Sequence, residues 1–154
     1  MSLKLPKLNL PYLPERVERK EGLVKVWDPL RKKWLQLTPE EWVRQSFMLY
    51  MHKDLGYPLG LTRSEYALKL NSTDKRADIV YFDREMKARV IVECKAAHIP
   101  LDKEVFEQVS RYFIAQEVDV MILTNGLYHH AFSFEEEKIH FYKEIPKFQE
   151  LVER

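Results

Sequence analysis

The sequence predicts an α/β domain in which helices flank a mixed β-sheet. Segments 38–53 and 101–116 carry the apolar period of amphipathic helices. Segments rich in β-branched and aromatic residues lie between and after them, and residues 89–96 form the most apolar of these. The order of helix, three strands, helix and further strands is typical of an α/β domain with a mixed sheet.

The first helix has clear start and stop signals. Thr38 is a natural N-cap, and Pro39 suits the first helical turn. Glu41 stands three residues after the cap, as in a capping box. The turn-forming run Gly56-Tyr57-Pro58 follows, so we expect the helix to end near Lys53.

The other elements follow from alternation and turn residues. Two short strands are predicted near the start, and the second helix has an apolar face that carries Val105, Val109 and Phe113. The predicted strands are residues 23–27, 33–37, 61–70, 76–82, 89–96, 118–123, 127–134 and 138–143, with a short closing helix at 146–153.

Composition bounds the class of protein. The 154 residues are 45% hydrophobic, enough for one packed domain, which we place at residues 23–154 after an extended arm at 1–22. The net charge of +1 excludes a globally basic nucleic-acid binder. The single cysteine excludes an internal disulfide, and no glycine-rich nucleotide motif is present. No apolar run is long enough to span a membrane, so a cytoplasmic location is expected.

One Glu-x-Lys triplet differs from the other three in the chain. Glu93-Cys94-Lys95 interrupts a strongly apolar strand, where charged groups are costly unless they are paired. Glu93 and Lys95 point to the same face because side chains of a strand alternate, and Cys94 points to the other. If the hairpin turns symmetrically about Glu85-Met86, Asp78 lies opposite Glu93.

Two facing carboxylates repel each other unless a cation, a proton or Lys95 compensates them. Mg²⁺ bound by Asp78, Glu93 and the main-chain carbonyl of Cys94 is a natural arrangement for a hard oxygen-seeking ion, with Mn²⁺ as the alternative. Such an ion stabilises charge on a phosphate and activates water. A solvated Asp–Lys–Glu cluster on the sheet surface fits the pattern equally well.

A series of motifs in fixed order resembles the N-terminal nuclease domain of the restriction subunit of type I restriction enzymes, in its small stand-alone form. That domain belongs to the PD-(D/E)XK nuclease superfamily, and the resemblance covers about residues 23–130. The motifs are 28–33, 37–45, 56–58, Glu65, 75–80, 92–96, Gln108 with Tyr112, and 123–126.

The resemblance implies a restriction-endonuclease-like core, metal-binding acids at Asp78 and Glu93, and a catalytic lysine at Lys95. It also implies that Gln108 and Tyr112, a QxxxY motif on one helical face, support DNA binding or the active site. Ala77 replaces the proline of the family motif without removing a ligand. The chain has no helicase motor motif, so translocation on DNA does not carry over.

Two functions remain in competition. The first is a Mg²⁺-dependent DNA endonuclease. The alternative is a non-cleaving or weakly cleaving DNA-binding accessory module that needs a partner, such as a helicase or translocase or a specificity subunit. The oligomeric state, including a homodimer, is left open.

Further residues are weaker candidates for the same site. Glu41 is a third acidic residue that would lie near the metal, with the capping box as its alternative role, and Glu65 is a similar candidate. A phosphate-contacting patch would be formed by Arg31, Lys32, Lys33, Arg44, Lys75 and Arg76, with a solvated charged surface as its alternative.

Overall fold

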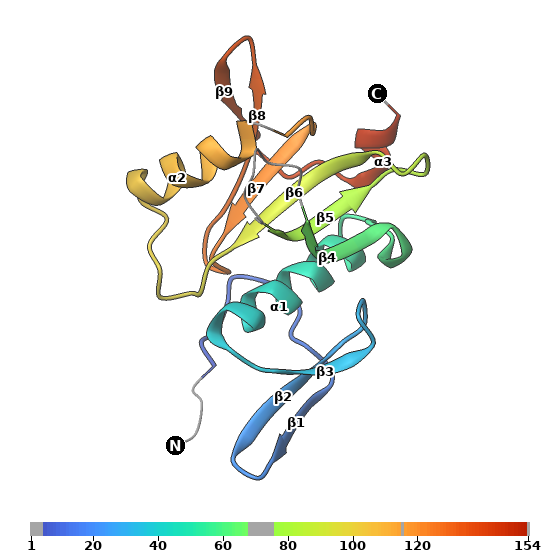
Figure 1. The fold of residues 1–154 in the computed structure, drawn as a ribbon, viewed down its shortest axis with the longest axis vertical. Coiled ribbons are helices and arrows are strands. Elements are labelled where there is room, and N and C mark those ends of the chain that lie inside the picture. Colours follow the sequence, from blue (N-terminus) through green and yellow to red (C-terminus); the bar gives the residue numbers. More distant parts are fainter. Residues whose placement is uncertain (1–4, 68–75, 115, 154) are drawn as a thin grey trace.

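The computed structural model describes residues 5–67, 76–114 and 116–153, and it contains two β-sheets (Figure 1). The smaller, antiparallel sheet comes from the start of the chain and has the order β1-β2-β3. Its strands are β1 (Val17–Lys20), β2 (Leu23–Asp28) and β3 (Lys33–Gln36).

The larger sheet has the order β4-β5-β6-β7-β8-β9. Only β6 and β7 pair in parallel, and every other neighbouring pair is antiparallel, so the predicted mixed sheet is confirmed. The strands are β4 (Thr62–Ala67), β5 (Arg76–Phe82), β6 (Ala88–Cys94), β7 (Val120–Thr124), β8 (His129–Glu135) and β9 (Lys138–Phe141).

Helices cover both faces of the larger sheet. The helices are α1 (Pro39–Lys53), α2 (Lys103–Ile114), α3 (Phe148–Val152) and the 3-10 turn η1 (Leu59–Leu61). Apolar residues of α1 and α3 form one buried cluster against the sheet, and those of α2 form a second cluster on the opposite face (Figure 1). None of the helices in the described residues has the length and apolar character needed to cross a membrane.

The start of α1 agrees with the predicted cap. The Glu41 main-chain N–H donates to Thr38 Oγ1 at 3.1 Å, and Pro39 occupies the first turn. Among the described residues, the Glu41 carboxylate forms no hydrogen bond back to the Thr38 main-chain N–H, so the predicted capping box is not complete. The carboxylate instead accepts hydrogen bonds from Arg31 and Arg44.

Most element boundaries differ from the sequence prediction by a few residues, and three differences concern the start of the chain, β4 and α2. Residues 17–20, which we placed in the extended arm, form β1, because a tight turn at Glu21 (φ 52°) and Gly22 (φ 78°) returns the chain onto it. In the segment predicted as a strand at 61–70, Thr62–Ala67 is a strand, and residues 68–70 lie outside the described residues. Helix α2 begins two residues later than predicted, at Lys103.

The segment before β1 is joined by hydrogen bonds to α1 and to the loop that follows β7. The Asn9 main-chain N–H donates to the Gly126 carbonyl at 2.8 Å, and Trp42 Nε1 donates to the Pro6 carbonyl at 2.9 Å. Leu8 is buried against Gly126, where φ is +84° and a Cβ atom would lie 2.8 Å from a Leu8 methyl carbon. Only glycine fits this turn without strain.

Candidate functional site

The register of β5 and β6 positions the two carboxylates. Ile79 pairs with Val92 and Val80 pairs with Ile91, which is the register that symmetry about Glu85-Met86 predicts. Continued by one residue, this register places Asp78 opposite Glu93.

Glu93 lies on the α2 face of the sheet, because Ile91, two residues earlier on β6, belongs to the buried cluster on that face. Ala77 and Val80 of β5 both belong to the same cluster, so the alternation of side chains is interrupted between them and does not assign Asp78 to a face. Cys94 is buried in the cluster on the α1 face, as expected for a residue that points away from the site.

Asp78 is held by the neighbouring strand. Its Oδ2 accepts a hydrogen bond from the Cys94 main-chain N–H at 2.7 Å. Burial raises the pKa of Asp78 to about 6, although the Cys94 N–H and the charges of Arg44 and Lys95 oppose the shift. The site therefore contains a carboxylate whose charge the surrounding residues compensate only in part.

Glu93 near the end of β6 and Lys95, the first residue after that strand, form an ion pair. Lys95 Nζ lies 3.6 Å from Glu93 Oε1, and their side chains are 29% and 13% exposed. The charge of Lys95 also lowers the pKa of Asp78. The structure thus brings Asp78, Glu93 and Lys95 together at one place on the sheet.

Asp78 and Glu93 offer hard carboxylate oxygens, which are the donors that a divalent cation such as Mg²⁺ prefers. Within residues 5–67, 76–114 and 116–153, no group of three or more His, Cys, Asp or Glu side chains is arranged to hold a metal ion. The side chains of Asp78 and Glu93 supply two carboxylates, so the main-chain carbonyl of Cys94 would be the third protein ligand. A cation kept by few protein ligands is typical of Mg²⁺, which retains several waters.

Glu41 is occupied by arginines rather than directed to the two carboxylates. Arg44 donates to it through Nε and Nη2, each at 2.6 Å, and Arg31 Nη2 donates to it at 3.2 Å. Its side chain is 5% exposed. We therefore do not include Glu41 among the proposed metal ligands.

Glu65 belongs to the same ion-pair network. Its two oxygens each lie 3.2 Å from a guanidinium nitrogen, one of Arg31 and one of Arg44. Arg31 Nε also pairs with the buried Asp28 at 2.7 Å. The network joins the β2–β3 turn to α1 and β4, and the pKa of Asp78 is also lowered by Arg44.

Sequence reasoning did not identify this network. Its local signal is spacing, since Glu41 precedes Arg44, and Asp28 precedes Arg31, by three residues. The long-range contacts of Glu65 have no such signal. Of the predicted basic patch, Arg31 and Arg44 are committed to carboxylates, and Lys75 lies outside the described residues.

The two residues of the QxxxY motif, Gln108 and Tyr112, differ in burial and in their distance from the carboxylates. Tyr112 is buried, and its pKa is raised by burial and then by the charges of Glu93 and Asp78, which places its hydroxyl in their electrostatic environment. Gln108 lies one turn earlier on α2 and is exposed. Only Tyr112 approaches the carboxylates, and a supporting role for Gln108 stays a prediction.

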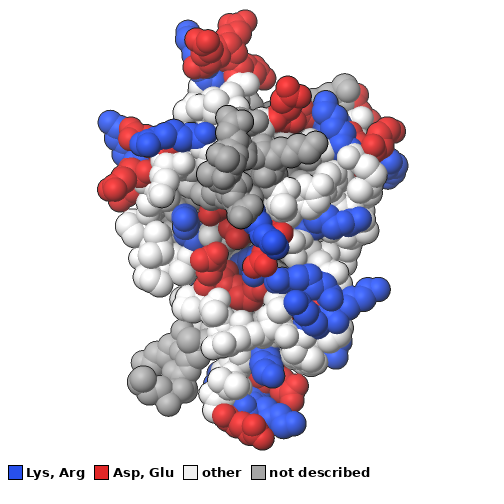
Figure 2. Space-filling model, viewed as in Figure 1, with Lys and Arg blue, Asp and Glu red and all other residues white. Residues whose placement is uncertain are grey.

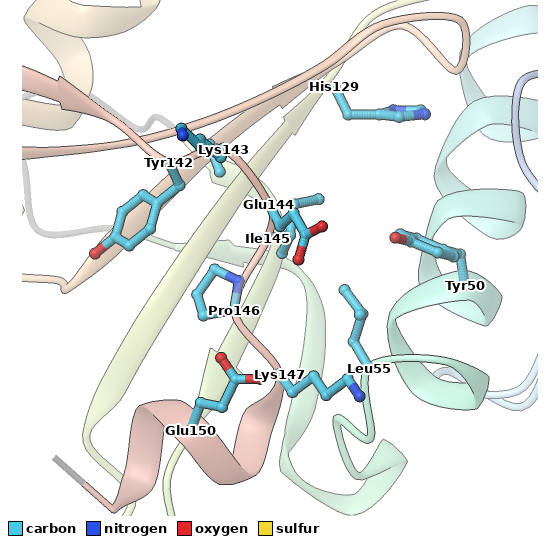
Figure 3. A pocket seen from close by; sticks show the side chains of 11 residues that line it. Tyr50, Leu55, His129, Tyr142, Lys143, Glu144, Ile145, Pro146, Lys147 and Glu150 are labelled. Atoms are coloured by element: carbon cyan, nitrogen blue, oxygen red, sulfur yellow. The ribbon is translucent and has the colours of Figure 1, made fainter.

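A separate pocket of about 510 Å³ lies on the α1 face, between α1, β8 and the C-terminal segment (Figure 3). Tyr50 points across it toward Glu144 (Figure 3). Its charged lining residues are Lys143, Glu144, Lys147 and Glu150, which balance in sign. This pocket contains none of the candidate catalytic residues and selects no class of ligand by charge.

Charge is unevenly distributed over the face drawn in Figure 2. Negatively charged side chains gather near its centre, over α1, and positively charged side chains lie beside them, over the β2–β3 turn (Figure 2). A chain with a net charge of only +1 thus carries a local basic region next to a local acidic one (Figure 2).

Comparison with known families decides where this arrangement belongs. Residues 39–146 match the family described as Type I restriction enzyme R protein N terminus (HSDR_N). The chain belongs to this family. The matched segment contains α1, the whole larger sheet and α2, and therefore all of the candidate catalytic residues.

The fold of this HSDR_N-family chain is also found in a solved structure. That structure is described as a fragment of an HsdR subunit of a type I restriction enzyme from Vibrio vulnificus YJ016. The two share 18% sequence identity with a TM-score of 0.57, over 76% of the present chain and 25% of the Vibrio chain. The likeness concerns the fold, and the present chain corresponds to about a quarter of that subunit fragment. No curated protein matches the chain.

Proposed function

We propose that the chain is a Mg²⁺-dependent endonuclease of the PD-(D/E)XK type that hydrolyses phosphodiester bonds in DNA. The observation that carries the proposal is Asp78, a partly buried carboxylate with a pKa of about 6 that the Cys94 main-chain N–H holds next to Glu93 and Lys95. Strongly perturbed carboxylates concentrate at functional sites. Membership of a restriction-enzyme family agrees with this chemistry.

Each residue has a distinct task in the proposed reaction. Asp78 and Glu93, with the Cys94 carbonyl, would hold Mg²⁺ or Mn²⁺. A bound ion supplies positive charge that stabilises the phosphate as negative charge develops on it. The Cys94 N–H keeps Asp78 Oδ2 in place at 2.7 Å, so the orientation of this carboxylate does not depend on the ion.

Lys95 acts on the attacking water. A protonated lysine has three N–H donors and no acceptor, so it orients the water by donating a hydrogen bond. Glu93 Oε1, 3.6 Å from Nζ, keeps the ammonium group on this side of the strand. The water oxygen then bonds to phosphorus, and the bond from phosphorus to one deoxyribose oxygen breaks, with a proton passing to the leaving oxygen.

Tyr112 is a positioning residue in this scheme. It packs against Phe113, with ring centroids 5.3 Å apart, in the buried cluster beneath the carboxylates. It therefore restricts how far Glu93 and Asp78 can move toward α2. Gln108, exposed on the same helix, would contact DNA rather than the carboxylates.

A second function is favoured by one specific observation. The net charge of the chain is only +1, so firm binding and cleavage of DNA would depend on further protein that acts beside this domain. In that case the chain binds DNA but cleaves it only with a helicase or translocase or a specificity subunit.

A cleavage assay on supercoiled plasmid separates the two functions. Wild-type protein is incubated with Mg²⁺, Mn²⁺ or EDTA, beside Asp78→Asn, Glu93→Gln and Lys95→Ala. Glu107→Gln is the matched control, since it removes an exposed carboxylate from α2. We expect cleavage with either metal by wild type and control alone. A wild type that binds plasmid without cutting it supports the accessory module, and one that does neither contradicts both functions.

A further inference from the structure

We propose that a pocket between the β2–β3 turn and β4 binds a phosphate of the DNA backbone, next to the Asp78–Glu93 site. This inference rests on the proposed function and extends it to a DNA-binding subsite. The pocket has a volume of about 380 Å³, and its lining includes Lys32, Arg63 and Ser64.

The positive charge of the pocket comes from two residues. Arg31 also lines it, but three carboxylates, those of Asp28, Glu41 and Glu65, already pair with this guanidinium. Lys32 and Arg63 are exposed, and neither forms an ion pair with any residue that the structure describes. Two cations without carboxylate partners attract an anion, and phosphate oxygens suit both side chains.

The pocket also contains polar groups that would contact a phosphate. Arg63 Nη1 donates to the carbonyls of Gly60 and Thr62, both at 2.9 Å, which fixes the guanidinium at the pocket wall. The Ser64 hydroxyl is buried and has no hydrogen-bond partner within the described part of the chain. Because this oxygen is closed to solvent, the phosphate would bind the Lys32 ammonium and the remaining N–H groups of the Arg63 guanidinium rather than Ser64.

The position along the sheet connects this pocket with the catalytic residues. Ser64 pairs with Ile79, the residue that follows Asp78 on β5. From strand spacing and rise, the main chains of Ser64 and Asp78 lie roughly 6 Å apart. Phosphates repeat about every 3.4 Å along the axis on each strand of a duplex, so the pocket would take a phosphate only a few nucleotides from the scissile one.

The charge pattern of Figure 2 fits this path for DNA. The basic region over the β2–β3 turn lies beside the acidic centre of the same face (Figure 2). Within the ion-pair network, Arg31 and Arg44 offset the acidic charge of Glu41 and Glu65. A DNA strand can therefore pass from the pocket to the carboxylates without meeting unpaired carboxylates of that network.

The test measures binding of a short labelled duplex by fluorescence anisotropy in EDTA, where no cleavage occurs, over a series of salt concentrations. Lys32→Glu/Arg63→Glu is compared with wild type and with Lys138→Glu/Lys143→Glu, a charge-matched control on exposed residues of the β9 region. Because each lost phosphate contact removes nearly one unit from the salt slope and the pocket takes one phosphate, we expect the slope to fall by about one and the affinity by about tenfold or more. The control should keep the wild-type slope.

A second variant protects the test against misfolding. Lys32→Gln/Arg63→Gln removes the two charges without reversing them, and should show a smaller loss of the same kind. Thermal unfolding in inorganic phosphate, at matched ionic strength, distinguishes a free ion from DNA as the source of the anion. Stabilisation of wild type alone by inorganic phosphate, with no change in duplex binding between the proteins, overturns the DNA subsite.

The outcomes also separate this inference from the proposed function. Equal duplex affinity and salt slope in wild type and both pocket variants overturn the pocket, while plasmid cleavage by wild type keeps the nuclease assignment. A wild type that neither binds duplex nor cleaves plasmid overturns both.

Discussion

The main-chain N–H of Cys94 donates a 2.7 Å hydrogen bond to Oδ2 of Asp78, one residue beyond the paired residues Ile79 and Val92. The bond crosses from β6 to β5 where a side chain, rather than a carbonyl, accepts it. It fixes the Asp78 carboxylate at the end of β6, beside Glu93. Burial nevertheless dominates its titration and raises its pKa to about 6.

This pKa predicts a pH dependence of stability. A carboxyl with a folded-state pKa of about 6, against an ordinary value of 3.8, holds its proton more tightly in the folded state. Its contribution to stability is therefore fully present below about pH 3.8 and is lost as the pH rises through 6. The loss amounts to about 3 kcal/mol at most. Urea unfolding at closely spaced pH values, with EDTA present, measures it.

Asp78→Asn isolates the contribution of this group. The asparagine amide does not titrate, so only wild type should lose stability as the pH rises from 4 to 6. The difference in unfolding free energy between variant and wild type should therefore change over this range and stay constant at higher pH. A difference that stays constant across this range would show that Asp78 titrates near its ordinary value.

The ion-pair network predicts an effect of Arg44 on stability. Arg44 is 12% exposed and Glu41 is 5% exposed, so Arg44→Ala leaves a nearly buried carboxylate with Arg31 as its remaining partner. Breaking one side of a buried pair costs about 3–5 kcal/mol. Chemical unfolding measures the change. Lys53→Ala, which breaks an exposed pair with Glu15, is the control and should cost less than about 1 kcal/mol.

Lys95 is predicted to act on rate rather than on DNA binding. Lys95→Ala should lower the single-turnover cleavage rate by about a hundredfold or more, since a group that orients or deprotonates the nucleophile contributes on this scale. Duplex affinity in EDTA should change little, because the Lys95 amine is partly buried and its charge is already paired with Glu93. A parallel loss of affinity and rate would make Lys95 a phosphate-binding residue instead.

Gln108 is predicted to matter for function and not for folding. It is exposed on α2, so Gln108→Ala should leave the unfolding free energy within about 0.5 kcal/mol of wild type. Plasmid cleavage and duplex binding should both decrease if the residue contacts DNA. Unchanged cleavage would limit the role of the QxxxY pair to Tyr112.

The sequence was sufficient to predict the register of β5 against β6, because a local rule decides it. The turn at Glu85-Met86 sets which residues pair, whereas the alternation of side chains is interrupted at Asp78 and does not decide its direction. Met86 has the positive φ, 61°, that a tight turn uses. The irregularity between Tyr81 and Phe82 lies nearer the turn and leaves the register at Ile79 unchanged.

Long-range contacts could not be predicted in the same way. Strand β1 has the sequence Val-Glu-Arg-Lys, and all four residues are exposed, so pairing rather than apolar burial stabilises it. The meeting of Arg31 and Arg44 at Glu65 depends on how the β2–β3 turn lies against α1 and β4. No periodicity in the sequence encodes that placement.

The most direct test of the central claim, that Asp78 and Glu93 hold one divalent cation, is thermal unfolding with EDTA and with millimolar Mg²⁺ or Mn²⁺. Binding to the folded state alone raises the melting temperature by mass action, so wild type and the Glu107→Gln control should melt higher with metal. Asp78→Asn should lose this response and melt no lower than wild type in EDTA. A metal response that survives in Asp78→Asn, or a variant clearly destabilised in EDTA, would contradict the claim.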